Sequence, residues 1–206
     1  MAKQALGSGI FEDGSASIPS IAFASAPGVG LYRLSSGNGV GVVGTLYSDL
    51  GLIGTTTNDQ PQAGGVGEYI QASRLRSANS GATTATAKDV LASPLSLTAG
   101  DWEVTGTLGI VPAAGTSITL VKWAISTIPT TMPASTDTYG VPTSNQVTGA
   151  YSTAAMVPGA NNDMIFSTPT CRISLPSTTN IYLVCNITFS VSTLGVYGGI
   201  TARRVR

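Results

Sequence analysis

The sequence predicts an all-β protein, with a C-terminal antiparallel β-sandwich or jelly roll that follows an extended N-terminal arm rich in glycine and serine. Apolar and polar residues alternate over many segments, and no segment shows the 3.6-residue period of an amphipathic helix. Clusters of Gly, Pro, Ser and Thr separate these segments, as turns do in sandwiches and barrels. The longest alternation covers residues 180–191, where the odd positions are apolar: Ile181, Leu183, Cys185, Ile187, Phe189 and Val191.

The N-terminal part differs from the rest of the chain. Residues 1–66 hold about half of the 25 glycines, with short apolar pieces at 18–23, 30–34 and 40–46. Such pieces are too short to bury a core alone, so we expect them to wrap around a partner or to pair with copies of themselves. The end of this region is rich in Thr, Asn, Gln, Pro and Gly, which is typical of a linker. The predicted domains are therefore an arm over residues 1–66 and a β-sandwich knob over residues 67–206.

The knob region predicts one strand after another. The expected strands cover residues 69–75, 90–98, 101–110, 117–126, 164–167, 171–175, 180–191 and 196–205. Residues 101–110 alternate cleanly, with Trp102, Val104, Leu108 and Ile110 on one face. Residues 117–126 are apolar on both faces, which predicts a central strand or one whose outer face meets another subunit. Residues 129–162 are rich in Pro, Thr and Ser and predict a long loop, where recognition surfaces are common.

The two cysteines flank a turn-rich stretch. A hairpin centred on Thr178 would place Cys171 opposite Cys185 and Ile173 opposite Leu183, all on one face. This geometry permits a disulfide. Cytosolic synthesis favours reduced thiols that pack as small hydrophobic groups, and we favour that reading.

Charge is scarce in this chain. Charged residues make up 10% of it, and the ten basic residues cancel the ten acidic ones. We expect such a chain to be poorly soluble alone and to assemble obligatorily; the alternative is a monomeric sandwich with a Thr-rich surface. The sequence shows no basic stripe, no apolar run long enough for a bilayer and no secretory signal, so we expect neither nucleic-acid binding nor membrane insertion.

Few residues suit catalysis or metal binding. The chain has no histidine, the commonest general base and metal ligand. Asp101 and Glu103 share a strand face and could mimic a glycosidase carboxylate pair, but a solvated outer face explains them better. Asp163, in an Asn-rich turn, could ligate calcium, although an Asx turn is the simpler interpretation. We therefore expect no enzymatic activity, no cofactor and no metal site.

Several stretches resemble a known family. Residues 97–110, 179–189 and 197–206 resemble the C-terminal domain of tailed-bacteriophage fibre proteins, which is similar to the trimeric jelly rolls of the tumour-necrosis-factor type. Residues 17–33, with their Pro-Ser-Ile and Gly-Leu-Tyr-Arg elements, resemble a segment that recurs in phage tail fibres and virion appendages. The resemblance implies a homotrimer that is assembled in the host cytoplasm, is fastened to the virion by its N-terminal part and points its knob outward.

Candidate functional residues follow from this organisation. The candidates for attachment to capsid, portal, neck or tail proteins are Phe23, Leu31, Tyr32 and Arg33. The candidates for contact with a host glycan or surface protein are Tyr139 and Tyr151 in the long loop. The candidates for the subunit interface are Trp123, Arg203 and Arg204; a solvated basic tail is the alternative for the two arginines.

The leading functional hypothesis is a non-enzymatic virion structural protein. It would be a short trimeric head or tail fibre that presents its knob for adhesion to the host surface. Two alternatives stay open at this point. The first is a capsid decoration or cement protein that stabilises the head, and the second is a carbohydrate-binding module.

Overall fold

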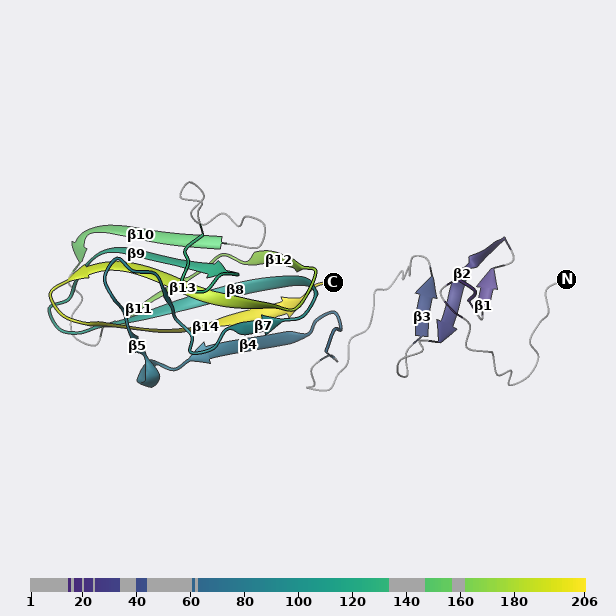
Figure 1. The fold of residues 1–206 in the computed structure, drawn as a ribbon, viewed down its shortest axis with the longest axis horizontal. Helices are drawn as coiled ribbons and strands as arrows, with labels where there is room; N and C mark the ends of the chain where they lie inside the picture. The colour runs from purple at the N-terminus through teal and green to yellow at the C-terminus, as the bar shows by residue number, and fades with distance from the viewer. Residues whose placement is uncertain are drawn as a thin grey trace. The chain divides into compact units, whose positions relative to one another are not determined.

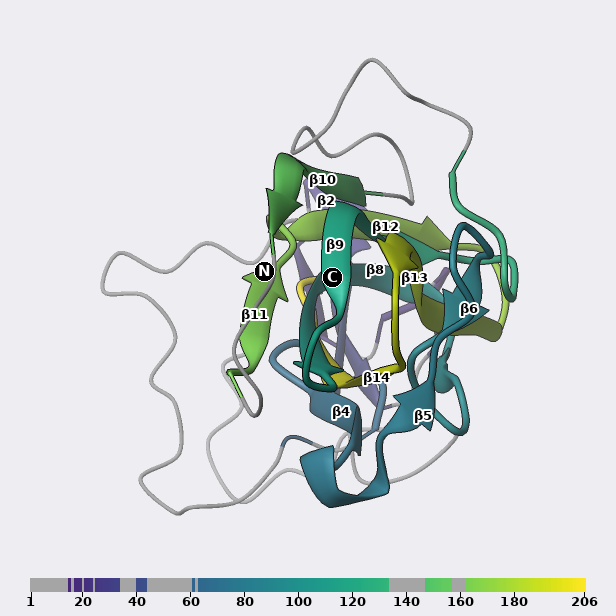
Figure 2. The same ribbon diagram turned by 90° about the vertical axis from the view of Figure 1, so that its left-hand side faces the viewer.

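The computed structural model separates the chain into two compact units, Met1–Thr57 and Asn58–Arg206. The described residues are 15, 17–19, 21–23, 25–33, 40–43, 61, 63–133, 147–156 and 162–206. The division falls earlier than the predicted boundary at residue 66. Gly67 and Glu68 are joined to the last strand of the C-terminal unit by backbone hydrogen bonds and by the Glu68 side chain. Figure 1 labels most strands of both units, and Figure 2 labels β6.

The N-terminal unit contains a three-stranded antiparallel sheet. Its strands are β1 (Ile21–Phe23), β2 (Ala26–Arg33) and β3 (Val40–Val43), in the order β1-β2-β3. The apolar pieces therefore pair with one another within one chain, which neither of the two expected arrangements foresaw. Short strands gain stability when a third strand joins them, which explains why all three pieces are used.

The first sheet of the C-terminal unit is built around its two longest neighbouring strands, β8 (Gly100–Pro112) and β14 (Leu194–Arg204), which are antiparallel. We call it the β8 sheet. Two short strands pair with successive parts of β8: β11 (Met164–Ser167) and β12 (Cys171–Leu175). On the other side of β14 lie β4 (Tyr69–Arg74) and β5 (Ser80–Gly81), joined through the 3-10 turn η1 (Arg76–Ala78).

The second sheet is built around β9 (Ser117–Ser126) and β13 (Thr179–Ser190), and we call it the β9 sheet. Strand β10 (Val147–Met156) pairs with β9 at one edge. The short strands β6 (Lys88–Asp89) and β7 (Leu95–Leu97) pair with β13. Strand β10 lies within residues 129–162, so the prediction of one continuous loop there was wrong.

The order of the strands is that of a jelly roll. We count β4 with β5, β6 with β7 and β11 with β12 as one strand each. In chain order, the eight resulting strands belong to the β8, β9, β8, β9, β9, β8, β9 and β8 sheets. This gives two facing four-stranded layers, β11/β12-β8-β14-β4 and β10-β9-β13-β6. The long strands run side by side in Figure 1 and are seen end-on in Figure 2. The predicted all-β sandwich is confirmed.

The core lies between the two layers, and the alternating strands supply it as predicted. The inward positions of β8 and β13 are fully or almost fully buried: Trp102, Val104, Leu108, Ile110, Ile181, Leu183, Cys185 and Ile187. Strand β9 adds Val121, Trp123 and Ile125 from its odd positions. Among the described residues, no helix has the length and apolar character needed to cross a bilayer.

The predicted hairpin between the cysteines was wrong. Cys171 on β12 lies opposite Val104 of the β8 sheet, whereas Cys185 on β13 lies opposite Trp123 of the β9 sheet. The turn-rich residues 176–178 carry the chain from one sheet to the other, and such a turn serves a sandwich corner as well as a hairpin. Both thiols are buried and form no disulfide. Burial raises the pKa of Cys171 to about 11 and that of Cys185 to about 12.

Candidate functional site

One face of the N-terminal sheet is apolar and exposed. Ile21, Leu31 and Val42 lie opposite one another across the three strands, and 45%, 39% and 42% of their surfaces are exposed. Val29 and Val40 occupy the same face by the alternation of strand side chains and are exposed too. A row of large apolar side chains left open to water is typical of a surface that meets a partner.

The opposite face of this sheet is held by a close contact. Tyr32 lies opposite Gly41, and a Cβ atom at Gly41 would overlap the tyrosine ring. A side chain at position 41 would therefore displace the half-buried Tyr32 ring. Among the predicted attachment residues whose side chains are described, Leu31 lies on the exposed apolar face and Tyr32 on the opposite face. Phe23 ends β1 and Arg33 ends β2, and their side chains lie outside the described residues.

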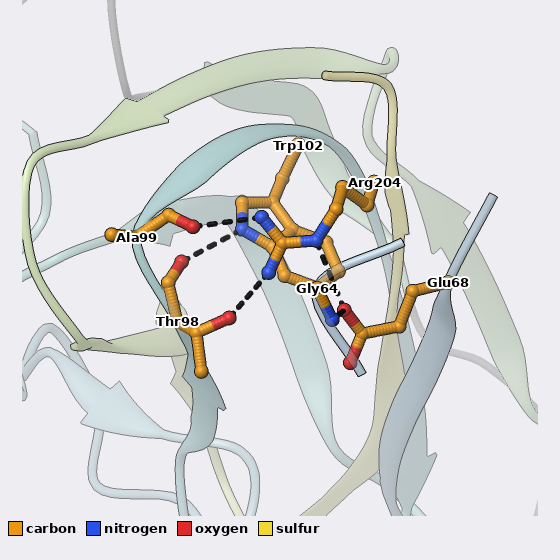
Figure 3. A network of polar contacts seen from close by, with 6 residues as sticks. All are labelled: Gly64, Glu68, Thr98, Ala99, Trp102 and Arg204. Carbon is orange, nitrogen blue, oxygen red and sulfur yellow. Dashed lines mark hydrogen bonds and ion pairs between the residues drawn. The ribbon is translucent and has the colours of Figure 1, made fainter. Parts of the chain in front are cut away.

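A buried arginine, Arg204, lies near the end of the last strand of the jelly roll, and Figure 3 shows its contacts. Arg204 is 4% exposed, and its Nε donates to Oε2 of Glu68 at 3.0 Å. Its Nη1 donates to the carbonyl of Ala99 at 2.7 Å, and its Nη2 donates to the hydroxyl of Thr98. The guanidinium carbon lies 4.2 Å from the centroid of the Trp102 ring, which is cation–π geometry. These contacts satisfy the cation within its own chain.

The same cluster ties the start of the C-terminal unit to its last strand. The Arg204 amide donates to the carbonyl of Glu68 at 2.8 Å, and the Gly67 amide donates to the carbonyl of Arg204 at 2.9 Å. The amide of Gly64 donates to the Glu68 carboxylate, and this bond is the main cause that lowers the pKa of Glu68. Gly100 has φ of +135°, and a Cβ there would overlap the Arg204 guanidinium. Glycine is therefore needed beside this buried charge.

This arrangement corrects the interpretation of Arg204. We expected it either to pair across a subunit interface or to be solvated, and it does neither. The reason is strand alternation: Arg204 continues the inward positions Ile200 and Ala202 of β14, at the point where the sandwich ends. Arg203 is on the outward face and is exposed, so its predicted role in a subunit interface stays open.

A second ionic cluster fastens the end of the chain. Asp101 is 3% exposed and pairs with Arg172 at 2.8 Å and with Arg206 at 2.6 Å. A hydrogen bond from Ser174, followed by the neighbouring Arg172, lowers the pKa of Asp101 to about 2. Because Asp101 is engaged by two cations while Glu103 is exposed, these two carboxylates do not form a glycosidase-like pair.

A third cluster joins η1, the start of β11 and β14. Asp163 accepts hydrogen bonds from Arg76 at 2.6 and 2.8 Å and from the Tyr197 hydroxyl at 2.8 Å. The bonds from Arg76 are the main cause that lowers the pKa of Asp163. Both carboxylate oxygens already have donors, so this residue is poorly placed to ligate calcium. No group of three potential metal ligands occurs in the part of the chain that the structure describes.

Trp123 belongs to the core of a single chain. Its ring lies 4.8 Å from that of Phe166, measured between centroids, and 8% of its surface is exposed. The prediction of a subunit contact at Trp123 was therefore wrong. Residues 117–126 are apolar on both faces, so alternation alone could not say which face the other sheet covers. The indole Nε1 is buried and lacks a hydrogen-bond partner among the described residues.

The predicted receptor-contact residues are only partly described. Tyr139 lies outside the described residues. Tyr151 lies in strand β10 opposite Val121, not in a loop, and its side chain lies outside the description. The sequence reasoning missed Glu68 and Thr98, the side-chain partners of the buried Arg204. One sequence signal was available: Arg204 follows Ile200 and Ala202 at alternate positions of its strand, which places its charge on the inward face and calls for such partners.

Comparisons with known proteins leave the family open. No family model and no curated protein matches this chain. Among solved structures, it is similar to one described as the structure of infectious bursal disease virus, Gx strain, with 11% identity and a TM-score of 0.40. The match covers 87% of this chain and 43% of the viral chain, so the present protein spans less than half the length of that structure.

Proposed function

We propose that this protein is a non-enzymatic structural protein of a phage virion, namely a short trimeric head or tail fibre. Its N-terminal unit would anchor it to other virion proteins, and its jelly-roll knob would adhere to the host surface. The sequence resemblance to phage fibre proteins suggests this role, and the two-unit architecture supports it. Three knobs on one fibre raise the effective concentration, so weak contacts with the host can hold a particle.

The observation that carries the proposal is the exposed apolar face of the N-terminal sheet. Covering each of its five large side chains would contribute roughly 1 kcal/mol, because between 39% and 67% of the surface of each is exposed. Several kcal/mol of docking energy therefore lie in a unit separate from the jelly roll. The jelly roll, in contrast, buries its own core and neutralises its buried charges within the chain.

The test is incorporation of the full-length protein into virions. We expect Leu31→Asp and Val42→Asp to remove the protein from purified particles, because a carboxylate in the covered face would be strongly unfavourable. Ile18→Asp is the matched control, since Ile18 is exposed in the same unit but lies outside the three strands. Incorporation of all three variants at wild-type levels would refute anchoring through this face.

Electron microscopy with a labelled antibody then separates the two virion roles. A label that projects from head or tail supports a fibre, and loss of host adhesion without this protein supports the adhesive role. A label spread over capsomer junctions, with reduced capsid stability on deletion, would replace the fibre by a decoration protein. Absence from purified virions would refute both roles.

A further inference from the structure

The middle of the outer face of the β8 sheet is polar and carries little charge. Strands β8 and β14 run side by side through its middle, and their outward residues lie directly opposite one another. The opposed pairs, in order along the strands, are Glu103 with Arg203, Thr105 with Thr201, and Thr107 with Gly199. One end of this face carries Glu103 and Arg203, with Arg172 opposite Glu103 and Tyr69 opposite Arg203 on their outer sides, whereas the middle has short hydroxyl side chains and glycine.

The hydroxyl groups of this face bond to one another. Thr105 Oγ1 lies 3.3 Å from Thr170 Oγ1, and Thr107 Oγ1 lies 3.4 Å from Ser167 Oγ. Groups that already have a partner lose less when water is removed from the face, so another surface can cover them at moderate cost. The short side chains also allow a second backbone to approach closely.

The charged pair at the end of the face is unusual in this chain. Glu103 and Arg203 are both exposed and lie opposite each other, yet the side chain of neither forms a hydrogen bond or an ion pair with any described residue. The neighbouring outward charges Asp101 and Arg172 are paired with each other. Glu103 and Arg203 thus keep their full capacity to bond with groups outside the chain.

We propose that this face is the interface between copies of the chain, with Glu103 of one subunit paired with Arg203 of the next. This inference rests on the trimer in the proposed function and names its contact surface. The pair of Glu103 and Arg203 is neutral, so by itself it favours neither a polyanion nor a polycation. It is complementary to itself, because each copy offers the acceptor that its neighbour's donor needs.

Three-fold symmetry can use every one of these charges. With a three-fold axis along the strands, each Glu103 meets the Arg203 of the next subunit, and the ring closes with every member of this pair engaged. The threonine and glycine rows would then form uncharged layers along the same axis. Scarce charge in the whole chain agrees with a molecule that covers much of its surface by assembly.

The test is a charge swap in the full-length protein, read out as mass against concentration by analytical ultracentrifugation. We expect Glu103→Arg and Arg203→Glu each to weaken trimer association by about a hundredfold or more, because each places like charges together at the contact. The double variant Glu103→Arg with Arg203→Glu should restore association to within about tenfold of wild type, since it only exchanges the two positions.

Two further variants test whether any effect is specific to this face. Lys122→Glu is the matched control: it reverses a charge on the β9 sheet, and association should not change. Thr201→Trp places a bulky ring in the centre of the proposed interface and should block association while circular dichroism shows an unchanged sandwich. All three test positions lie on an outward face and bury no core, so folding should survive.

Each outcome decides the proposal. A trimeric wild type with weakened single variants and a restored double variant supports it. A trimer that none of the variants weakens would overturn this interface and leave the trimer standing. A monomeric wild type would overturn both. Loss of host or glycan binding in the single variants, with unchanged mass, would assign the face to a ligand instead and overturn the proposal.

Discussion

Replacing Arg204 by methionine tests whether the buried cluster at the end of the jelly roll holds the two sheets together. The change keeps an apolar stem against Trp102 but removes the cation that bonds to Glu68, Ala99 and Thr98. The Glu68 carboxylate, whose side chain is 13% exposed, would lose its counter-charge. Removing one partner of a buried ion pair costs about 3–5 kcal/mol, and we expect the free energy of unfolding to fall by this amount. The lost hydrogen bonds overlap with this figure and do not add to it.

Urea unfolding of the full-length protein, followed by tryptophan fluorescence at fixed protein concentration, measures this loss. With a slope of about 2–3 kcal/mol per molar urea, the midpoint should fall by about 1.5 M. Arg172→Met is the matched control, because Arg172 is 62% exposed and Asp101 keeps Arg206; its midpoint should move far less.

The double variant Arg204→Met with Glu68→Met sharpens the test. Replacing both members of a buried pair by apolar residues leaves no unpaired charge, so much of the lost stability should return. A midpoint for Arg204→Met within about 0.2 M of wild type would refute the reasoning, since that corresponds to about 0.5 kcal/mol. A double variant as unstable as the two single losses added together would refute the pairing itself.

Three other outcomes are expected. Gly41→Val should displace Tyr32 and increase hydrogen exchange in β1–β3, with an unchanged unfolding midpoint for the jelly roll; protection equal to wild type would contradict the close contact. The folded-state pKa of Asp101 lies at about 2, below its ordinary 3.8, so it stabilises the fold above pH 4 and this contribution should disappear as pH falls toward 2. The pKa values of Glu68 and Asp163 are lowered too, so these carboxylates also stabilise the fold less as pH falls. Asp101→Asn should therefore reduce the decrease in melting temperature that thermal unfolding shows between pH 4 and pH 2. Cys171 and Cys185, with pKa values of about 11 and 12, should resist alkylation at pH 8 in the native protein and react fully in urea, as mass spectrometry would show.

Alternation along the strands was enough to predict which residues form most of the core. Trp102, Val104 and Leu108 on β8 point inward, as the period of two requires, and the odd positions of β13 do the same. Alternation with a period of two indicates that a strand has one solvent-exposed face and one buried face, and it can be recognised without knowing the partner strand. For this reason the all-β sandwich could be predicted without the structure.

The same pattern could not identify the partners. Cys171 and Cys185 lie on strands that are neighbours in sequence, but those strands belong to opposite sheets. A turn-rich stretch reverses the chain equally well within one sheet and across the corner of a sandwich. Trp123 failed for a related reason: both faces of its strand are apolar, so only the position of the other sheet shows which face is the core.

By itself, the sequence determined the class of the fold and the faces of its regular strands. The tertiary structure alone decided where the charges lie. Arg204 and Arg203 are adjacent and look alike in the sequence, yet one is buried on Trp102 and the other is exposed opposite Glu103. Their difference arises because neighbouring side chains on a strand point to opposite faces, and only the packed sandwich makes one of those faces an interior.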